Sequence, residues 1–359
     1  KFFEGTLSVM YKGKDDTGEV QGGPMYMILS GLGPKWKPLA VFFSISGLIG
    51  TLCIMQSNQF TEAITSIFFT PEQNTVTLRL IIGIIITVIV ACVVLGGIKR
   101  ISKVATVVVP FMAIAYVVFA IILIFSNLDK IPAAVELIVK GAFNPSAVTG
   151  GIVGTMFIAM QKGVARCVFS NEAVLGSSPI ASAAAKTKEP VRQGLVTMTG
   201  TFLDTIIICT MTGLCVVMTG ANEQGLEGVE VTMWAFGNGF PWPTIVGYVI
   251  LATCLALFAF STILGWDYYA ERCFDYFTNG NKGAIRAYRW LYVAAVAIGP
   301  FLPLAVVWDF ADLMNGLMAF PNLVALFALS GVVAKETFDF WKRRQSGEYK
   351  DNLPEKKAK

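Results

Sequence analysis

Two basic residues stand inside a strongly apolar stretch of the sequence. Lys162 and Arg166 are four residues apart, so both lie on one face if this stretch is a helix. Gly163 interrupts an apolar run at Met156–Gln161. A charge in apolar surroundings is costly and commonly marks a pathway or an ion pair. For Arg166 alone, we favour the role of a membrane-interface anchor.

Asp204 is the acidic residue that we expect to pair with Lys162. It lies twelve residues beyond Arg192, which is about 18 Å along a helix, and so deep within an apolar segment. An unpaired charge at that depth is costly. Asp267 lies nearer the cytoplasmic end of its apolar segment, and we expect a structural role for it.

Four consecutive polar residues, Gln56 to Gln59, occupy another apolar segment. On a helix in lipid they must face protein or water. Gln56 and Asn58 are candidates for polar contacts to a small solute. Hydrogen bonding between neighbouring helices is the alternative role for both side chains.

The elements that position these residues are membrane-spanning helices. Hydrophobic residues make up 55% of the chain and charged residues 14%, a composition too apolar for a soluble domain. Pro110, Pro300 and Pro303 lie inside apolar runs, where we expect them to kink helices. Runs of about 20 residues that cross a bilayer predict eight spans. One begins near Pro243, and the others are Pro38–Thr61, Leu80–Ile98, Val104–Ser126, Gly141–Gln161, Thr205–Asn222, Trp290–Trp308 and Leu313–Ala334.

Lys and Arg residues concentrate in alternate loops of this arrangement. Of the 28, 23 fall within residues 1–37, 97–104, 183–194, 271–289 and 335–359. Because cationic loops stay in the cytoplasm, this pattern predicts a multi-pass protein of the cell membrane with both present termini cytoplasmic. The loop from Asn222 to Val231 has three Glu residues and no basic residue, which suits the outside.

The most informative motif lies within residues 161–190. Gly163 and Arg166 lead into Phe-Ser-Asn-Glu-Ala at 169–173, and Gly176 and Ser177 follow. Further motifs are Gly-Gly-Pro-Met-Tyr at 22–26, Gly-Gly-Ile-Lys-Arg at 96–100 and Phe-Ser-Thr-Ile-Leu-Gly-Trp at 260–266. With these motifs, the sequence strongly resembles the alanine/glycine:cation symporters from about Glu4 to Phe340. Cys167 and Val174 stand where we expect glycine in the family, and valine does not easily adopt a positive φ.

The resemblance implies an all-α polytopic membrane protein with the leucine-transporter-like fold. That fold has two inverted five-helix repeats, whose broken first and sixth helices surround a site at mid-membrane. Residues 1–128 would hold the end of core helix 2 and core helices 3–5, and residues 148–335 core helices 6–10. Residues 129–147 would form an extracellular surface helix and loop, and residues 336–359 a cytoplasmic tail. Core helix 1 and most of core helix 2 would be absent, so we expect an N-terminal truncation.

A broken core helix 6 would expose backbone amides and carbonyls, which can hold the carboxylate of a substrate and a cation. We therefore expect Met160, Gln161 and Gly163 to contact a small zwitterion. Ser177 is expected to cap the next helix. Beside it, Asn171 and Glu172 would cap or gate, and hydrogen bonding within the loop is their alternative.

Core helix 8 provides the cation hypothesis. In this fold, sodium between core helices 1 and 8 is bound by a carbonyl and, three and four residues later, by two hydroxyls. Phe258, Ser261 and Thr262 supply this pattern, and oxygen ligands suit a hard cation. Hydrogen bonding of the hydroxyls to their own helix is the alternative. Trp266 would wall the pocket or, alternatively, lie in the interfacial aromatic belt.

Two segments outside the spans also have expected roles. Residues 223–240 would form an extracellular lid by analogy with the family. The segment Lys130–Phe143 would lie as a helix along the outer surface.

The function implied by the resemblance is inward symport of alanine or glycine with Na+ as the coupling ion, by alternating access. Proton coupling through Lys162 or Glu172 is the nearest alternative. An ion channel is a further alternative, although the sequence has no repeated filter motif. An enzyme is not expected, because the sequence has no histidine and no HExxH or GxSxG pattern.

Overall fold

The computed structural model describes residues 1–14, 18–68, 75–143 and 152–347. Within these ranges the regular secondary structure is helical apart from a short hairpin, in which β1 (Gly13–Lys14) pairs antiparallel with β2 (Val20–Gln21). Three expected segments lie partly outside the described residues: the span at 141–161, the surface segment at 129–147 and the tail at 336–359.

Six helices in the described ranges are long and apolar enough to cross a membrane, which confirms a polytopic helical membrane protein. They cover Pro34–Thr65, Val76–Val94, Arg100–Ser126, Pro190–Thr219, Thr244–Thr278 and Leu304–Ala328. They correspond to six of the eight expected spans. The other two correspond to α8 (Ile152–Asn171) and α14 (Lys282–Ile298), which are not among these six.

The first span is interrupted near its middle. The N-terminal region forms α1 (Phe2–Met10), α2 (Pro24–Leu32), the 3-10 turn η1 (Pro34–Trp36), α3 (Lys37–Gly50) and α4 (Ile54–Phe68). Between α3 and α4, Cys53 adopts a φ of 55°. The break at residues 51–53 corrects the expected span Pro38–Thr61, which was predicted to be uninterrupted.

The next two helices show why these segments suit lipid. In α5 (Val76–Val94), Ile81, Ile84, Ile85 and Val88 are about half exposed, whereas Ile82, Ile86 and Val90 are buried on the other face. Such spacing gives one face to protein and one to lipid. In α6 (Ile98–Ser126), the expected Pro110 lies inside the helix.

The middle of the chain alternates long and short elements. It forms the 3-10 turn η2 (Leu128–Lys130), α7 (Ile131–Phe143), α8, α9 (Ser177–Ala183), α10 (Pro190–Thr201), the π-helical segment η4 (Phe202–Cys209), α11 (Thr210–Thr219), the 3-10 turn η5 (Ala221–Glu223) and α12 (Val229–Gly239). The expected helix at Lys130–Phe143 is therefore confirmed as a helix. At α9, Gly176 is the N-cap, and the expected cap Ser177 is the first helical residue.

The last part of the chain contains α13 (Thr244–Thr278), α14, the 3-10 turn η6 (Gly299–Phe301), α15 (Leu304–Ala328) and α16 (Ser330–Gln345). Pro243 is the N-cap of α13, as expected. Pro300 and Pro303 do not kink one helix but separate α14 from α15, which corrects the expected span boundaries at 290–308 and 313–334. Residues 336–345 of the expected tail are helical, since α16 reaches Gln345.

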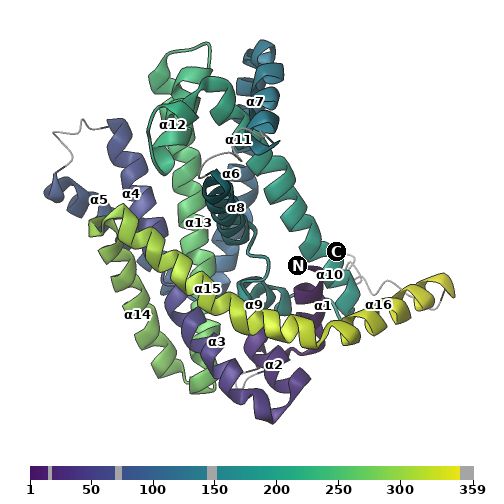
Figure 1. The fold of residues 1–359 in the computed structure, drawn as a ribbon. Coiled ribbons are helices and arrows are strands. Elements are labelled where there is room, and N and C mark those ends of the chain that lie inside the picture. Colours follow the sequence, from purple (N-terminus) through teal and green to yellow (C-terminus); the bar gives the residue numbers. More distant parts are fainter. Residues whose placement is uncertain (15–17, 69–74, 144–151, 348–359) are drawn as a thin grey trace, which may run out of the picture.

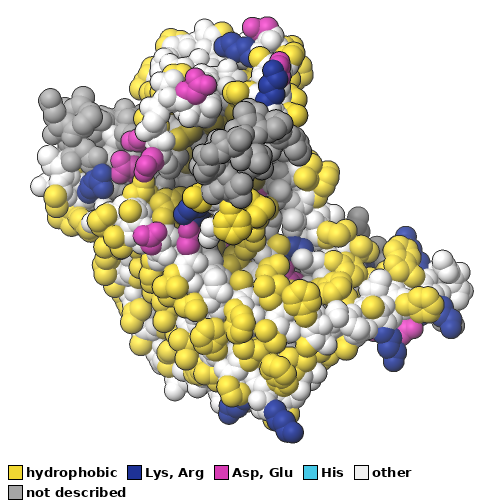
Figure 2. Space-filling model, viewed as in Figure 1, with side chains coloured by type: hydrophobic (Ala, Val, Ile, Leu, Met, Phe, Trp, Pro, Cys, Tyr) yellow, Lys and Arg dark blue, Asp and Glu magenta, His cyan; other side chains and the backbone are white. Residues whose placement is uncertain are grey.

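α13 is the central element of the arrangement (Figure 1). It packs against α3, α4, α5, α6, α12 and α14, while α15 crosses α2, α3 and α4. Hydrophobic side chains cover much of the face seen in Figure 2, and Lys and Arg side chains gather mainly at its ends and along α16. This distribution is that of a helical bundle in lipid.

Candidate functional site

Arg166 and Asp312 join α8 to α15 by a two-point ion pair. Arg166 Nη2 donates to Asp312 Oδ1 at 2.5 Å and also to Oδ2. The guanidinium lies 4.1 Å from the centre of the Trp308 ring, where cation–π attraction adds to the pairing. Lys162 Nζ lies 4.0 Å from the same carboxylate. Arg166 therefore has a specific partner in protein rather than a purely interfacial role.

The expected pair of Lys162 and Asp204 is not formed, and this is a correction. Asp204 accepts hydrogen bonds from Ser170 Oγ at 2.9 and 2.8 Å, while Lys162 is nearest to Asp312. Depth along a helix did not predict the partner of Lys162, because the acid nearest to Lys162 is Asp312 on α15, far away in the sequence. Asn171 Nδ2 donates to Thr205 Oγ1 at 3.0 Å, which ties the end of α8 to the same π-helical segment.

Phe169, Trp266 and Trp308 form an aromatic wall. The Phe169 ring lies 5.8 Å from Trp266 and 6.2 Å from Trp308, measured between ring centres. Trp266 is buried, so it does not belong to an interfacial belt. Its Nε1 donates to Glu172 Oε1 at 2.8 Å, and Ser177 Oγ donates to Glu172 Oε2 at 2.9 Å. Glu172 thus links the wall to the start of α9.

The loop between α8 and α9 has an unusual backbone. Glu172, Val174 and Gly176 have φ angles of 54°, 75° and 87°. Val174 adopts the left-handed conformation that we did not expect of valine, and its carbonyl accepts a hydrogen bond from Asn322 Nδ2 at 2.7 Å. Burial raises the pKa of the Glu172 carboxyl above its ordinary value, although the charge of Lys1 and the two hydrogen bonds act in the opposite direction.

A narrow cavity of about 10 Å³ lies where the α3–α4 break faces this wall. It is lined by Gly50, Cys53, Ile54, Met55, Gln56, Phe169, Trp266, Phe310, Ala311 and Asn315. Two expected site residues, Gln56 and Trp266, therefore come together here. At this size the cavity has room for about one water molecule, so the conformation is closed.

Asn58 has the alternative role expected for it, hydrogen bonding to a neighbouring helical segment. Its Nδ2 donates to the carbonyls of Gly299 at 3.0 Å and Leu302 at 2.8 Å. These carbonyls lie where η6 interrupts the helical hydrogen bonds between α14 and α15. Asn58 therefore stabilises a helix break and is committed to protein contacts.

The expected break at Gly163 is wrong. α8 continues from Ile152 to Asn171, and a Cβ added at Gly163 would meet no described atom within 4 Å. A single glycine costs a helix only about 1 kcal/mol, so the helix continues. Met160 and Gln161 lie on the exposed side of α8 and do not line the cavity. The structure does not bring these three residues together with Gln56 and Trp266.

Three oxygens on α13 lie together. Ser261 Oγ and Thr262 Oγ1 each donate to the carbonyl of Phe258 at 2.9 Å. These bonds are the back-bonding that we had considered as the alternative. Each hydroxyl oxygen still has lone pairs when it donates its proton, so the same three oxygens suit one side of a hard-cation site. Trp266 follows Thr262 by one helical turn.

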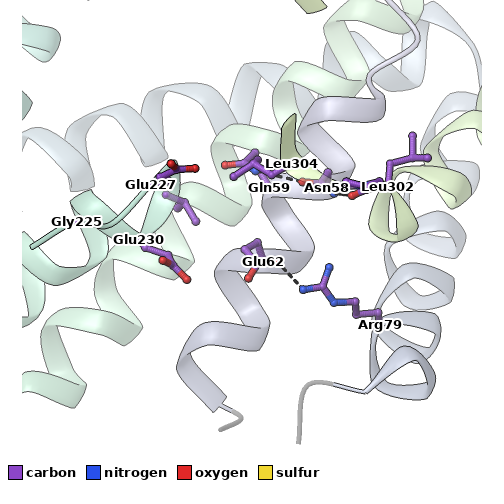
Figure 3. A pocket seen from close by; sticks show the side chains of 11 residues that line it. Asn58, Gln59, Glu62, Arg79, Gly225, Glu227, Glu230, Leu302 and Leu304 are labelled. Atoms are coloured by element: carbon purple, nitrogen blue, oxygen red, sulfur yellow. Dashed lines mark hydrogen bonds and ion pairs between the residues drawn. The ribbon is translucent and has the colours of Figure 1, made fainter. Parts of the chain in front are cut away.

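A second cavity, of about 370 Å³, is acidic and was missed by sequence reasoning (Figure 3). It is lined by Asn58, Gln59, Glu62, Arg79, Gly225, Glu227, Val229, Glu230 and Leu302–Leu304. Arg79 Nη2 donates to Glu62 Oε2 at 2.9 Å, and Glu227 and Glu230 come from the segment before and at the start of α12. The sequence feature that could have indicated this cavity is the acidic loop at 222–231, which concentrates negative charge beside α4.

Comparison with known proteins extends over almost the whole chain. The chain matches the sodium:alanine symporter family over residues 1–354. It is 47% identical to an uncharacterized transporter of Haemophilus influenzae over 353 residues, 97% of this chain and 75% of that protein. It is 42% identical to the sodium/alanine symporter AgcS of Methanococcus maripaludis, over 95% of this chain and 74% of that one. It is 36% identical to the probable sodium/glutamine symporter GlnT of Bacillus subtilis, over 98% and 72%.

These matches agree with the bundle of apolar helices and with the motifs around the Glu172 loop and α13. Members of such a family are transporters rather than enzymes. The chain belongs to the sodium:alanine symporter family.

Proposed function

We propose that the protein carries a small neutral amino acid, alanine or glycine, into the cell together with Na+. The observation that carries the proposal is on α13: the oxygens of Phe258, Ser261 and Thr262 lie one turn from Trp266, which walls the cavity. A cation at these oxygens and a solute against Trp266 would act on the same helix. Family membership supports this coupling.

The cavity favours a small substrate. Its side facing the α3–α4 break offers Gln56, while Phe169, Trp266 and Ala311 present apolar surface. Apolar walls with a few polar groups suit a zwitterion with a short side chain. Met160, Gln161 and Gly163 would contribute to binding only if α8 moved toward this cavity, because they lie outside it in the closed conformation.

The arrangement of repeats and the orientation are part of the proposal. The basic loops support cytoplasmic termini for the present chain. The motifs at residues 161–190 and 260–266 support a transporter of the leucine-transporter-like class, in which interrupted helices surround the transport site. The break at residues 51–53 falls in core helix 3 of that arrangement rather than in core helix 1 or 6. Residues 1–128 and 148–335 would be its two inverted repeats, with the acidic cavity of Figure 3 on the extracellular side.

Uptake in liposomes tests the proposed function. The full-length protein is reconstituted, and labelled alanine uptake is measured with an inward Na+ gradient and with Na+ replaced by choline. One Na+ that crosses 100 mV and a tenfold gradient supplies about 3.7 kcal/mol, enough for about 500-fold accumulation. We expect saturable uptake only with Na+. Equal uptake in choline would contradict Na+ coupling, and single-channel currents would indicate a channel instead.

Proton coupling is the second candidate, because Glu172 is a carboxyl whose pKa is raised by burial and which contacts the aromatic wall. Varying pH and Na+ separately during uptake distinguishes the two ions. Accumulation driven by a pH gradient without Na+ would favour the proton.

A further inference from the structure

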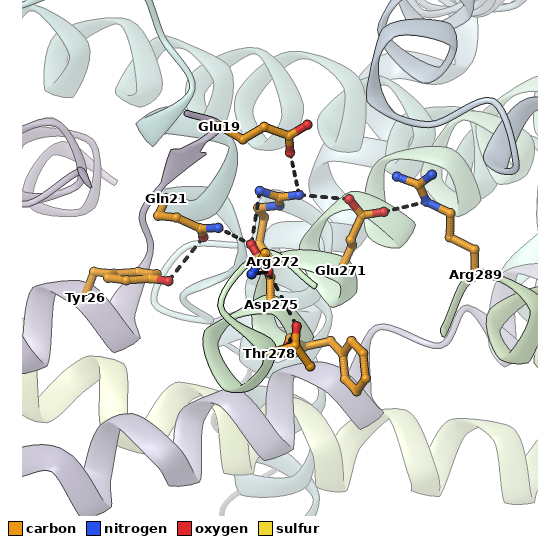
Figure 4. A network of polar contacts seen from close by, with 10 residues as sticks. Glu19, Gln21, Tyr26, Glu271, Arg272, Asp275, Thr278 and Arg289 are labelled. Atoms are coloured by element: carbon orange, nitrogen blue, oxygen red, sulfur yellow. Dashed lines mark hydrogen bonds and ion pairs between the residues drawn. The ribbon is translucent and has the colours of Figure 1, made fainter. Parts of the chain in front are cut away.

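Buried charges gather at the end of α13, and nearly all of them are paired (Figure 4). Arg272 Nη2 donates to Glu271 Oε1 at 2.8 Å and to Glu19 Oε2 at 2.9 Å. Arg289 Nε, on α14, donates to Glu271 Oε2 at 2.7 Å. The backbone N–H of Gly280 donates to Asp275 Oδ1 at 2.6 Å, and Gln21 also donates to this carboxylate. Each of these acids therefore has a guanidinium or N–H donor as a partner.

Asp267 differs from these acids. It lies one turn before Glu271 and is fully buried, yet neither of its carboxylate oxygens has a hydrogen-bond partner among the described residues. The hydroxyl of Tyr288, a residue adjacent to Arg289, is buried and equally without a partner in that part of the chain. Around Asp267 on α13, Ile263, Leu264, Trp266 and Ala270 belong to one hydrophobic cluster.

An ionised carboxylate in such surroundings is very costly unless a charge compensates it. A sodium ion would need several more oxygen ligands, whereas Asp267 is set among apolar side chains. Tyr292, the nearby hydroxyl on α14, already donates to the carbonyl of Ile263 at 2.7 Å. A proton compensates the charge without further ligands, so it fits this environment better than a metal ion.

We propose that Asp267 is a proton-binding site, and that Arg289 controls it by pairing with either Glu271 or Asp267. In the conformation seen here, Arg289 pairs with Glu271 and Asp267 holds a proton on one carboxylate oxygen. If Arg289 moves one turn along α13 to Asp267, the O–H bond breaks, the proton leaves to water and the carboxylate pairs with the guanidinium. Asp267 and Glu271 are four residues apart and lie on one face of α13, so a guanidinium beside that face has two alternative partners.

The charged and titratable groups around Asp267 come from three parts of the structure. They are Glu271 on the same helix, Tyr288, Arg289 and Tyr292 on α14, and Cys53 at the α3–α4 break. Arg289 is the cation among them, and Cys53 also lines the transport cavity. Proton release from Asp267 would therefore be felt both at the ion-pair network and at the α3–α4 break.

This proposal goes beyond the proposed function and is tested without transport. Infrared difference spectra of the full-length protein are recorded against pH for wild type, Asp267→Asn and the matched control Asp275→Asn. At neutral pH we expect a protonated carboxyl band, distinct from any band that Glu172→Gln removes, that Asp267→Asn abolishes and Asp275→Asn retains. The proposal is overturned if the band is absent, or if it survives in Asp267→Asn.

Two further variants test the role of Arg289 and keep Asp267 intact in case Asp267→Asn does not fold. Glu271→Gln frees Arg289, so Asp267 should lose its proton at a lower pH than in wild type. Arg289→Gln removes the cation that would stabilise the Asp267 carboxylate, so Asp267 should lose its proton at a higher pH than in wild type. Unchanged midpoints in both variants would overturn the switch. A Na+-dependent carboxylate band at Asp267 without a protonated form would show a metal site and overturn the proton site.

Discussion

The guanidinium of Arg166 on α8 binds both carboxylate oxygens of Asp312 on α15, which is 146 residues away in the sequence. Trp308, one turn before Asp312, lies against the same guanidinium and continues the aromatic wall through Phe169 to Trp266. The ion pair and the wall together hold α8 and α15 around the closed cavity. Opening of the cavity through α8 would have to break them.

Removing the acid of this pair should loosen α8. Asp312→Asn leaves Arg166 and Lys162 without their shared counter-charge, and we expect a loss of about 1–3 kcal/mol in the free energy of unfolding. The side chains of the pair are about one-third exposed, so we expect no larger value. Denaturant unfolding in detergent measures it.

Asp309→Asn is the matched control, because Asp309 is an exposed acid on the same helix. We expect it to unfold as wild type does. Equal stability of the two variants would show that the Arg166–Asp312 pair contributes nothing measurable.

Glu172 should make stability depend on pH. Burial raises the pKa of Glu172 in the folded protein above its unfolded value, so its contribution is fully present below the unfolded pKa and is lost as the pH rises through the folded one. Glu172→Gln is neutral at all pH values. Its stability relative to wild type should therefore increase over the pH range above about 4, the ordinary pKa of a glutamate carboxyl. Thermal unfolding across this range measures the difference, with exposed Glu223→Gln as the control; parallel curves for wild type and Glu172→Gln would contradict the raised pKa.

The hydroxyls on α13 should set the Na+ requirement. Ser261→Ala and Thr262→Ala each remove one oxygen from the proposed cation site, and we expect the half-saturating Na+ concentration for uptake to rise about tenfold or more, the equivalent of 1.4 kcal/mol. Thr253→Ala is the control, since Thr253 Oγ1 also donates to its own helix, at Val249 O, but at an exposed position. If all three variants shift the Na+ dependence equally, the hydroxyls serve only the helix.

Gly176 should be essential to the packing of the loop before α9. Its φ is 87°, and an added Cβ would lie 2.6 Å from Phe43 Cε2 and 2.7 Å from Pro24 Cγ. Gly176→Ala should therefore cost about 1–3 kcal/mol in unfolding free energy. Gly200→Ala, in α10 with open space around it, should instead be neutral or stabilise by up to about 1 kcal/mol. A stable Gly176→Ala protein would show that the loop can move away from α2 and α3.

The spans could be predicted because lipid imposes length and hydrophobicity on each segment separately. Pro243 correctly indicated the start of α13, since proline is well accommodated at a helix N-terminus. The break at Cys53 was not predicted, because the residue that adopts the positive φ is a cysteine, although Gly50 ends the helix just before it. At Gly163 a helix break was predicted and none is found, since a glycine permits a break without requiring one.

The candidate site was predicted in part for a similar reason. Trp266 and Gln56 were found because a polar or aromatic residue in an apolar run is visible locally. The partner of Lys162 was assigned wrongly, because pairing depends on which helices are neighbours. Asp312, on α15, was not considered as a partner. The lack of a hydrogen-bond partner for Asp267 among the described residues could be recognised only from the structure, because it depends on which donors lie near each acid.

Coupled flux of the two solutes tests the central claim most directly. In liposomes that contain the full-length protein, labelled Na+ and labelled alanine are followed together, with no Na+ gradient and an inward alanine gradient. A symporter must let alanine drive Na+ uptake in a fixed ratio, and Thr262→Ala should weaken this flux while Thr253→Ala leaves it unchanged. Alanine entry without any accompanying Na+ would contradict Na+-coupled symport.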